Sequence, residues 1–408
     1  MAADPPGEPA AAPMPHGRRI LVALGITQIL AWGTSFYLLT VLAGPIAEDT
    51  GWPLTFVVGG FSAALLVSGL AAPKVGRLIA RHGGRGVLAG GAALMGAGLA
   101  LLGLSPTLPV FLAGWLIIGL AMSASLYDPA FSTLGSLYGK AARRPITTLT
   151  LFGGFASTVC WPLSAWLVET VGWRGTCLAY AAIQIGLSLP LLLSCLPRKA
   201  AAPPPPNGTA ARPAGSPDLS PRGRRMFLLL AAALVIAGII ATTMSVHLIA
   251  LLDARGVALA AAVSMGMLIG PSQVGGRLFE IAFGRHYHPI RTLTAAAILG
   301  ATGILLLYSG LSIPALALVF YGSGLGIWTI ARGALPLALF GPGDYPVLMG
   351  RLAMPTLVAQ ALAPSAGAFL IDRGGAEAVF VMVAGLAAAN LCVVLTLAIL
   401  HARWGDPA

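Results

Sequence analysis

The chain has very few charged residues for its length. Asp, Glu, Lys and Arg make up 9% of its 408 residues, whereas hydrophobic residues make up 57%. A soluble domain carries about 25% charged residues, so this chain lacks the polar side chains to cover a water-facing surface. Repeated apolar runs of about 20 residues instead predict transmembrane helices. Strands of a membrane barrel would be shorter, about 10 residues, with alternating polarity.

Features that carry catalysis or cofactor binding are also missing. The four cysteines lie in or beside apolar runs without metal-type spacing, which favours a packing role over a disulfide framework or a metal site. No phosphate-binding glycine loop with Lys and Ser or Thr occurs, and no nucleophile elbow. The sequence therefore predicts a protein that is not an enzyme, has no cofactor or metal and does not use ATP directly.

Acidic residues are scarce, and the formal net charge is +11. The basic residues gather on one side of the predicted spans, and only Arg174, Arg255 and Arg373 lie on the other. This asymmetry follows the positive-inside rule, so it requires no nucleic-acid partner. It predicts an integral protein of a bacterial inner (plasma) membrane, with both termini cytoplasmic and with the lipid bilayer as its surroundings.

The apolar runs predict an all-α polytopic membrane protein with twelve transmembrane helices. Their approximate bounds are Ile20–Leu42, Pro53–Pro73, Val87–Leu104, Leu108–Leu134, Ile146–Val168, Gly175–Leu196, Met226–Leu251, Ala258–Phe279, Thr292–Ser309, Ile313–Leu335, Leu348–Leu370 and Ala376–Leu400. The Pro-rich segment between the sixth and seventh spans predicts a disordered linker. The expected units are a cytoplasmic tail (1–17, not a signal peptide), a six-helix bundle (18–197), a cytoplasmic linker (198–225), a second six-helix bundle (226–400) and a second tail (401–408).

A basic glycine-rich stretch, Val75–Arg85, follows the second span. Its Gly76-Arg77-Leu78 recurs as Gly276-Arg277-Leu278 at the end of the eighth span, 276 − 76 = 200 positions later. Both copies belong to the second span of their half, so the chain reads as two six-helix pseudo-repeats.

This organisation resembles the major facilitator superfamily. The family signature in the turn after span two reads roughly Gly-x-Leu-x-Asp-Arg-x-Gly-Arg-Arg, and this chain has Gly76, Leu78, Arg81, Gly83 and Arg85 at matching positions. The resemblance implies a conformational turn that includes Gly76, Arg77, Arg81, Gly83 and Arg85, and a cavity lined by spans one, four, seven and ten. The chain departs from the signature at Ala80, which replaces the Asp that helps latch one state, and at Gly84.

Span eight is weakly similar to that of monocarboxylate-porter relatives. These carry Asp-x-x-x-Arg, whose Arg contacts the substrate carboxylate, and this chain has Gln273-x-x-x-Arg277. Arg277 is therefore a candidate substrate ligand, with Gln273 one helical turn away. Two alternatives remain: an ion pair with Glu280 on the same helix, or contact with lipid headgroups.

Ionisable residues at membrane depth are costly and therefore informative. Asp128 lies 20 residues after Leu108 in span four, and Arg332 lies 19 residues after Ile313 in span ten. This equal depth predicts a pair that closes the cytoplasmic gate or couples transport to protons; the alternative is a static pair of Asp128 with Arg81 or Arg85. His247 in span seven is a second candidate for proton coupling, unless it is a hydrogen-bonded helix residue.

Uncharged polar and aromatic residues of the inner spans complete a predicted substrate cavity, although each aromatic taken alone also fits packing or an interfacial belt. The set consists of Gln28, Trp32, Tyr37, Tyr127, Tyr321, Trp328 and Gln360, together with Gln273 and Arg277.

These features predict a monomeric secondary active transporter that works by rocker-switch alternating access. We expect proton symport of a small organic anion such as a monocarboxylate, with proton-driven efflux of amphipathic drugs or metabolites as the alternative. A membrane sensor that does not transport, or a membrane enzyme, fits less well, because the chain shows neither a signalling domain nor a catalytic constellation.

Overall fold

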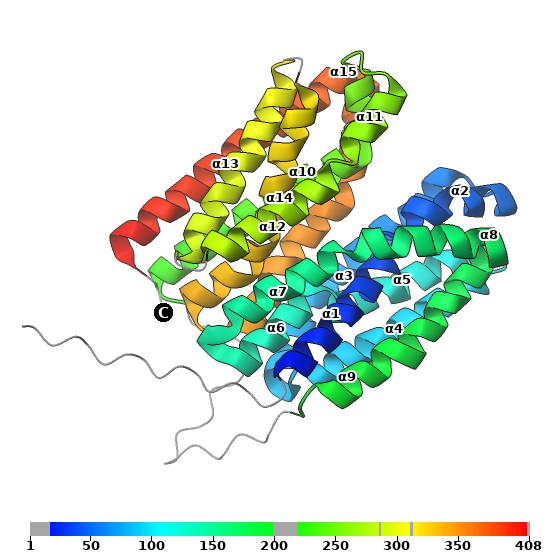
Figure 1. Cartoon of the computed structure of the whole chain (residues 1–408), viewed down its shortest axis with the longest axis horizontal. Helices are drawn as coiled ribbons and strands as arrows, with labels where there is room; N and C mark the ends of the chain where they lie inside the picture. The colour runs from blue at the N-terminus through cyan, green and yellow to red at the C-terminus, as the bar shows by residue number, and fades with distance from the viewer. Residues whose placement is uncertain (1–16, 199–218, 285–286, 311–312, 406–408) are drawn as a thin grey trace, which may run out of the picture.

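The computed structural model describes residues 17–198, 219–284, 287–310 and 313–405, and every regular element in these ranges is helical. Figure 1 shows the arrangement. The helices of the first part are α1 (Gly17–Gly33), α2 (Leu38–Thr50), α3 (Leu54–His82), α4 (Gly84–Gly103), α5 (Leu108–Ser125), α6 (Tyr127–Tyr138), η1 (Gly139–Ala142), α7 (Arg143–Gly154), α8 (Ala156–Ile183), η2 (Gln184–Ser188) and α9 (Leu189–Cys195). Those of the second part are α10 (Pro221–Asp253), α11 (Leu259–Gly266), α12 (Ile269–Phe283), α13 (Pro289–Tyr308), α14 (Pro314–Phe340) and α15 (Tyr345–Trp404).

Eight helical segments of the described chain are long and apolar enough to cross a membrane. Two of them, Leu108–Cys195 with 88 residues and Tyr345–Trp404 with 60, far exceed the length of one span. Each contains a glycine with positive φ, Gly172 (φ 70°) and Gly375 (φ 67°), at which the helix direction breaks. A side chain at these positions would be strained, so the glycines permit the sharp turns. The protein is thus an integral membrane protein, and its number of spans stays a prediction.

The chain forms two helical bodies, which we call the N half (17–198) and the C half (219–405). α10 begins at Pro221 and α15 continues to Trp404, so parts of the predicted linker and second tail are helical. The first predicted tail (1–17), apart from Gly17, lies outside the described residues, as do linker residues 199–218. We call the end of the bundle that holds Gly17, Pro221 and Trp404 the terminal end.

The two halves meet along α3 and α15 through small residues. A Cβ atom added to Gly76 of α3 would overlap the carbonyl oxygen of Pro346, and one added to Gly350 of α15 would lie 2.5 Å from the carbonyl oxygen of Ala72. Glycine allows this close approach of two membrane helices. The sequence predicts a turn from Val75, whereas α3 continues as a helix to His82. Gly76 is therefore a packing residue rather than a turn residue.

Shared packing of the halves is concentrated at the terminal end. A buried cluster there combines Leu24, Phe131 and Ile146 of the N half with Tyr345 and Met349 of the C half. At the opposite end the buried cluster of the C half contains only residues of that half, and the buried cluster of the N half contains one residue of the C half, Ala361. Figure 1 agrees: α6 and α7 approach α12 and α14, whereas α2 and α11 lie far apart. The structure is thus closed at the terminal end.

Candidate functional site

A break in the helix axis between α5 and α6 builds one wall of the site. Pro129 has no N–H, so the carbonyl oxygen of Ser125, four residues earlier, loses its helical partner. The side chain of Gln28 replaces it, with its Nε2 donating to that oxygen at 2.6 Å. Trp32 Nε1 donates in turn to Gln28 Oε1 at 3.2 Å. Gln28 therefore supports the break, and both ends of its amide are occupied.

The break places Asp128 in the first turn of α6, where the helix dipole favours a carboxylate. Its Oδ2 forms an ion pair with an Nη of Arg332 from α14, so the pair joins the two halves. The guanidinium carbon of Arg332 also lies 5.7 Å from the ring centre of Trp328. The alternative pairing of Asp128 with Arg85 does not occur, since Arg85 donates to the carbonyl oxygen of Leu193.

Arg277 of α12 is buried at the boundary between the halves, with 4% of its surface exposed. Its Nη2 donates to Gln273 Oε1 at 3.2 Å and its Nε to Thr329 Oγ1 at 3.3 Å. Its Nη1 is buried and has no hydrogen-bond partner. Nη1 points at Gly154 of α7, where even a Cβ atom would overlap it. A buried cation with one unpartnered donor favours a bound anion.

No carboxylate of the described residues pairs with Arg277. Glu280, the expected alternative partner, accepts from Thr292 at 2.7 Å and lies 3.5 Å from Arg143 Nη2. Arg143 of α7 also donates to the carbonyl oxygens of Gly284 and Tyr287. This second connection between the halves is not among the sequence predictions. An acidic residue near the end of a span was the available signal, because such a group needs a partner.

An aromatic cluster of the N half lies near Arg277. The ring of Trp32 lies 4.9 Å from that of Tyr127 and 6.3 Å from that of Tyr37. The Tyr127 hydroxyl lies against Gly153 of α7, the neighbour of Gly154, at which Arg277 Nη1 points. The Tyr127 hydroxyl donates to the carbonyl oxygen of Thr150 at 3.3 Å. Of the predicted cavity residues, Gln273 therefore contacts Arg277 directly, and Tyr127 lies against the residue next to Gly154 in α7, with Trp32 packed against both Tyr127 and Tyr37.

The other predicted residues lie elsewhere. His247 is buried in α10, with Nε2 3.0 Å from the carbonyl oxygen of Pro364 in α15, as in the hydrogen-bonded alternative. Gln360 of α15 packs near Gly238 of α10. Tyr321 and Trp328 line a separate cavity within the C half.

The turn between α3 and α4, where the sequence predicts a conformational turn, consists of a single residue, Gly83 (φ 79°). Arg77 is half-buried near the end of α3, and Arg81 is exposed. Gly84, where the family signature has Arg, packs so closely against Thr133 that a Cβ atom would overlap its hydroxyl. The departure from the signature thus has a steric reason. No group of three His, Cys, Asp or Glu in the described ranges is placed to hold a metal.

Comparison with known families identifies the chain. The sequence profile of the Major Facilitator Superfamily matches residues 24–336, well over half of the length. The chain belongs to this superfamily. It is therefore a transporter of small molecules and not an enzyme, in agreement with the sequence prediction. A comparison with curated protein sequences finds no match.

Solved structures share the fold at low sequence identity. The human organic anion transporter MFSD10 (TETRAN) matches with a TM-score of 0.72 and 19% identity, over 93% of this chain and 100% of that one. The proton:xylose symporter XylE, bound to 6-bromo-6-deoxy-D-glucose, matches with a TM-score of 0.69 and 13% identity, over 95% of this chain and 96% of that one. The E. coli fucose:proton symporter FucP matches with a TM-score of 0.70 and 13% identity, over 94% of this chain and 99% of that one.

Proposed function

We propose that the chain is a secondary active transporter with twelve spans and cytoplasmic termini that moves a small organic anion by alternating access. The unpartnered Nη1 of Arg277 carries this proposal. A buried guanidinium without a carboxylate is unfavourable, and a bound carboxylate supplies both a countercharge and acceptors for its fork of donors. The name of one structural relative, an organic anion transporter, agrees with this choice.

The aromatic walls narrow the substrate class. Trp32 and Tyr127 form an aromatic pair, and Tyr127 lies against Gly153, the neighbour of the residue at which Arg277 Nη1 points. Flat rings favour an apolar or aromatic body, because stacking adds to the gain from burial. An aromatic monocarboxylate such as benzoate therefore fits better than a small hydroxy acid. The same walls connect this proposal with its alternative, the efflux of amphipathic compounds.

We assign the gate at the terminal end to Asp128 and Arg332. Their pair joins the halves and lies beside the shared cluster that closes this end. Alternating access requires such contacts to break when the terminal end opens. Two structural relatives are named proton symporters, which supports proton coupling here, and Asp128 is the carboxylate placed to take up a proton as the pair breaks.

Paired acid and amide ligands test the proposal on the purified full-length protein. Benzoate and benzamide have nearly the same shape, but only benzoate carries a charge. We expect benzoate to raise the melting temperature and benzamide to have no effect, because ligand binding stabilises by about 2.7 kcal/mol at 100 times Kd.

Two variants assign the effect to Arg277. Arg277→Gln should abolish the benzoate shift, whereas Arg224→Gln, which removes an exposed arginine of α10, should preserve it. Equal shifts for benzoate and benzamide, or an undiminished benzoate shift in Arg277→Gln, would refute anion binding at this site. Uptake of labelled benzoate into proteoliposomes then separates transport from binding without transport, as in a membrane sensor.

A further inference from the structure

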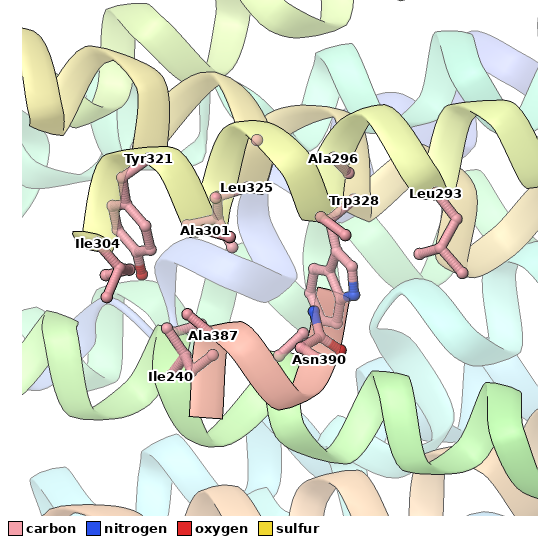
Figure 2. A pocket seen from close by; sticks show the side chains of 15 residues that line it. Ile240, Leu293, Ala296, Ala301, Ile304, Tyr321, Leu325, Trp328, Ala387 and Asn390 are labelled. Atoms are coloured by element: carbon pink, nitrogen blue, oxygen red, sulfur yellow. The ribbon is translucent and has the colours of Figure 1, made fainter. Parts of the chain in front are cut away.

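The C half contains a cavity apart from the site at Arg277. It lies among α10, α13, α14 and the second part of α15 (Figure 2), and it is open on one side. Its wall is mostly Ala, Gly, Leu and Ile, and none of its lining residues is charged. Such a wall suits a neutral, largely apolar ligand, since an ion would lose its hydration without gaining a countercharge.

Two polar groups in this wall have no partner. They are the Nε1 donor of Trp328 and the Oδ1 acceptor of Asn390, both buried. The exposed fractions of the two residues are only 7% and 9%. Figure 2 shows both side chains at the same part of the cavity, Trp328 from α14 and Asn390 from α15. Buried donors and acceptors are rarely left unpaired, because each then loses its hydration without replacement.

We propose that this cavity binds a neutral ligand with an apolar body and one hydroxyl group. A hydroxyl both donates and accepts, so a single one can donate to Asn390 Oδ1 while accepting from Trp328 Nε1. An alkane would leave both groups unpaired. A carboxylate could accept from Trp328 but would repel Asn390 Oδ1 and meet no cation. The alcohol group therefore matches the wall in a way that neither alternative does.

Binding here would act on the gate through Trp328. Its ring centre lies 5.7 Å from the guanidinium carbon of Arg332, one helical turn further along α14, and Arg332 pairs with Asp128. A ligand that holds the Trp328 ring in place would thus also fix one side of the gate arginine. This consequence rests on the proposed gate, whereas binding itself does not.

Quenching of tryptophan fluorescence by bromine tests the binding on the purified full-length protein. The probe is a terminally brominated alkanol, compared with a bromoalkane of the same length. We expect saturable quenching by the bromoalkanol, and no saturable component with the bromoalkane. Trp328→Phe, which keeps the ring but removes the reporter and the donor, should lose the saturable component. Asn390→Val, which keeps the reporter, should weaken binding about two- to tenfold through loss of one hydrogen bond.

Equal saturation by the two probes, or unchanged binding in Asn390→Val, would overturn the proposal and leave a bridging water as the partner of both groups. Ala301→Leu provides a second, independent variant, because it fills the cavity from its apolar wall and leaves both Trp328 and Asn390 in place. It should remove the saturable component as well. Saturable quenching that persists in Ala301→Leu would place the bromoalkanol outside this cavity.

Such a hydroxyl can come from a bilayer lipid or from a dissolved hydrophobic alcohol. Brominated diacylglycerol in proteoliposomes separates these sources, with brominated phosphatidylcholine, which has no free hydroxyl, as control. Trp328-dependent quenching by the diacylglycerol alone assigns the site to a lipid. Its absence, together with saturable quenching by the bromoalkanol, assigns the site to a dissolved alcohol. Absence of both overturns the proposal.

Discussion

Replacing Asp128 with Asn tests whether its ion pair with Arg332 keeps the terminal end closed. The exposed side-chain fractions are 14% for Asp128 and 11% for Arg332, so the pair is nearly buried. Breaking a fully buried pair costs about 3–5 kcal/mol, because one charge stays uncompensated. Arg332 keeps its contact with Trp328 and slight exposure, so we expect about 2–3 kcal/mol. The pair forms only when the halves touch, so the whole cost falls on the closed state.

This free energy corresponds to about a 30- to 150-fold shift toward opening of the terminal end. Met349, which is 1% exposed in the shared cluster, provides a reporter after its replacement with Cys. The more accessible native thiols, Cys195 and Cys392, are first replaced with Ser. A water-soluble maleimide should label Met349→Cys slowly as long as Asp128 is present. In Asp128→Asn the labelling should be about 30 to 150 times faster, provided that the labelling rate follows the population of the open state.

Two controls make the labelling result specific. Exchange of the charges, Asp128→Arg with Arg332→Asp, should restore slow labelling, because the pair can form again. Glu377→Gln breaks a pair with Arg255 (3.0 Å) that lies within the C half, and it should leave the labelling rate unchanged. Equal labelling rates for the parent and Asp128→Asn would refute the gate. Additive effects of Asp128→Arg and Arg332→Asp in the exchanged variant, in place of a return to slow labelling, would refute it too.

Three further outcomes follow from the contacts at the site. Gly154→Val should reduce benzoate uptake by at least about tenfold, because its side chain would overlap the guanidinium nitrogen Nη1 of Arg277 and displace it; uptake equal to that of the parent would contradict this placement. Tyr345→Phe removes the hydroxyl that donates to the Gly333 carbonyl oxygen at 2.7 Å, a bond within the C half, so it should lower the free energy of unfolding by about 1 kcal/mol and leave thiol labelling at the terminal end unchanged; faster labelling would show that this bond also holds the gate closed. An inward proton gradient should stimulate benzoate uptake, and His247→Gln should preserve the stimulation because Gln can still donate to the same backbone carbonyl; flux that ignores the gradient would exclude coupling, and its loss in His247→Gln alone would make that residue the carrier.

Distances along a helix made the central pair predictable. Asp128 and Arg332 lie 20 and 19 residues from the starts of their predicted spans, and a constant rise per residue turns equal counts into equal depth. Since so few charges exist at this depth, a pairing followed almost directly. The contact between Gln273 and Arg277 was predictable for a similar reason, because residues four apart share a helix face.

Rotation about the helix axis was not predictable in the same way. Tyr321 and Trp328 belong to an inner span by count, yet they face the cavity within the C half. α14 contains few polar side chains, so its sequence shows no clear amphipathic stripe from which to assign faces. The close approach of Gly154 to Arg277 joins residues 277 − 154 = 123 positions apart. That contact depends on how the two halves pack against each other, and a single sequence contains no pattern that predicts this packing.

The charges at the site lead to a prediction about the empty carrier. Asp128 pairs with Arg332 and Glu280 with Arg143, which leaves Arg277 as the one uncompensated cation among these five residues. Enclosing such a charge between both halves is costly, whereas a bound anion neutralises it. The loaded carrier should therefore change its orientation faster than the empty carrier. Exchange of labelled benzoate against benzoate on the other side should accordingly exceed net uptake, and Arg277→Gln should lose this advantage because its empty site is neutral. Net uptake as fast as exchange would show that the empty site finds another countercharge.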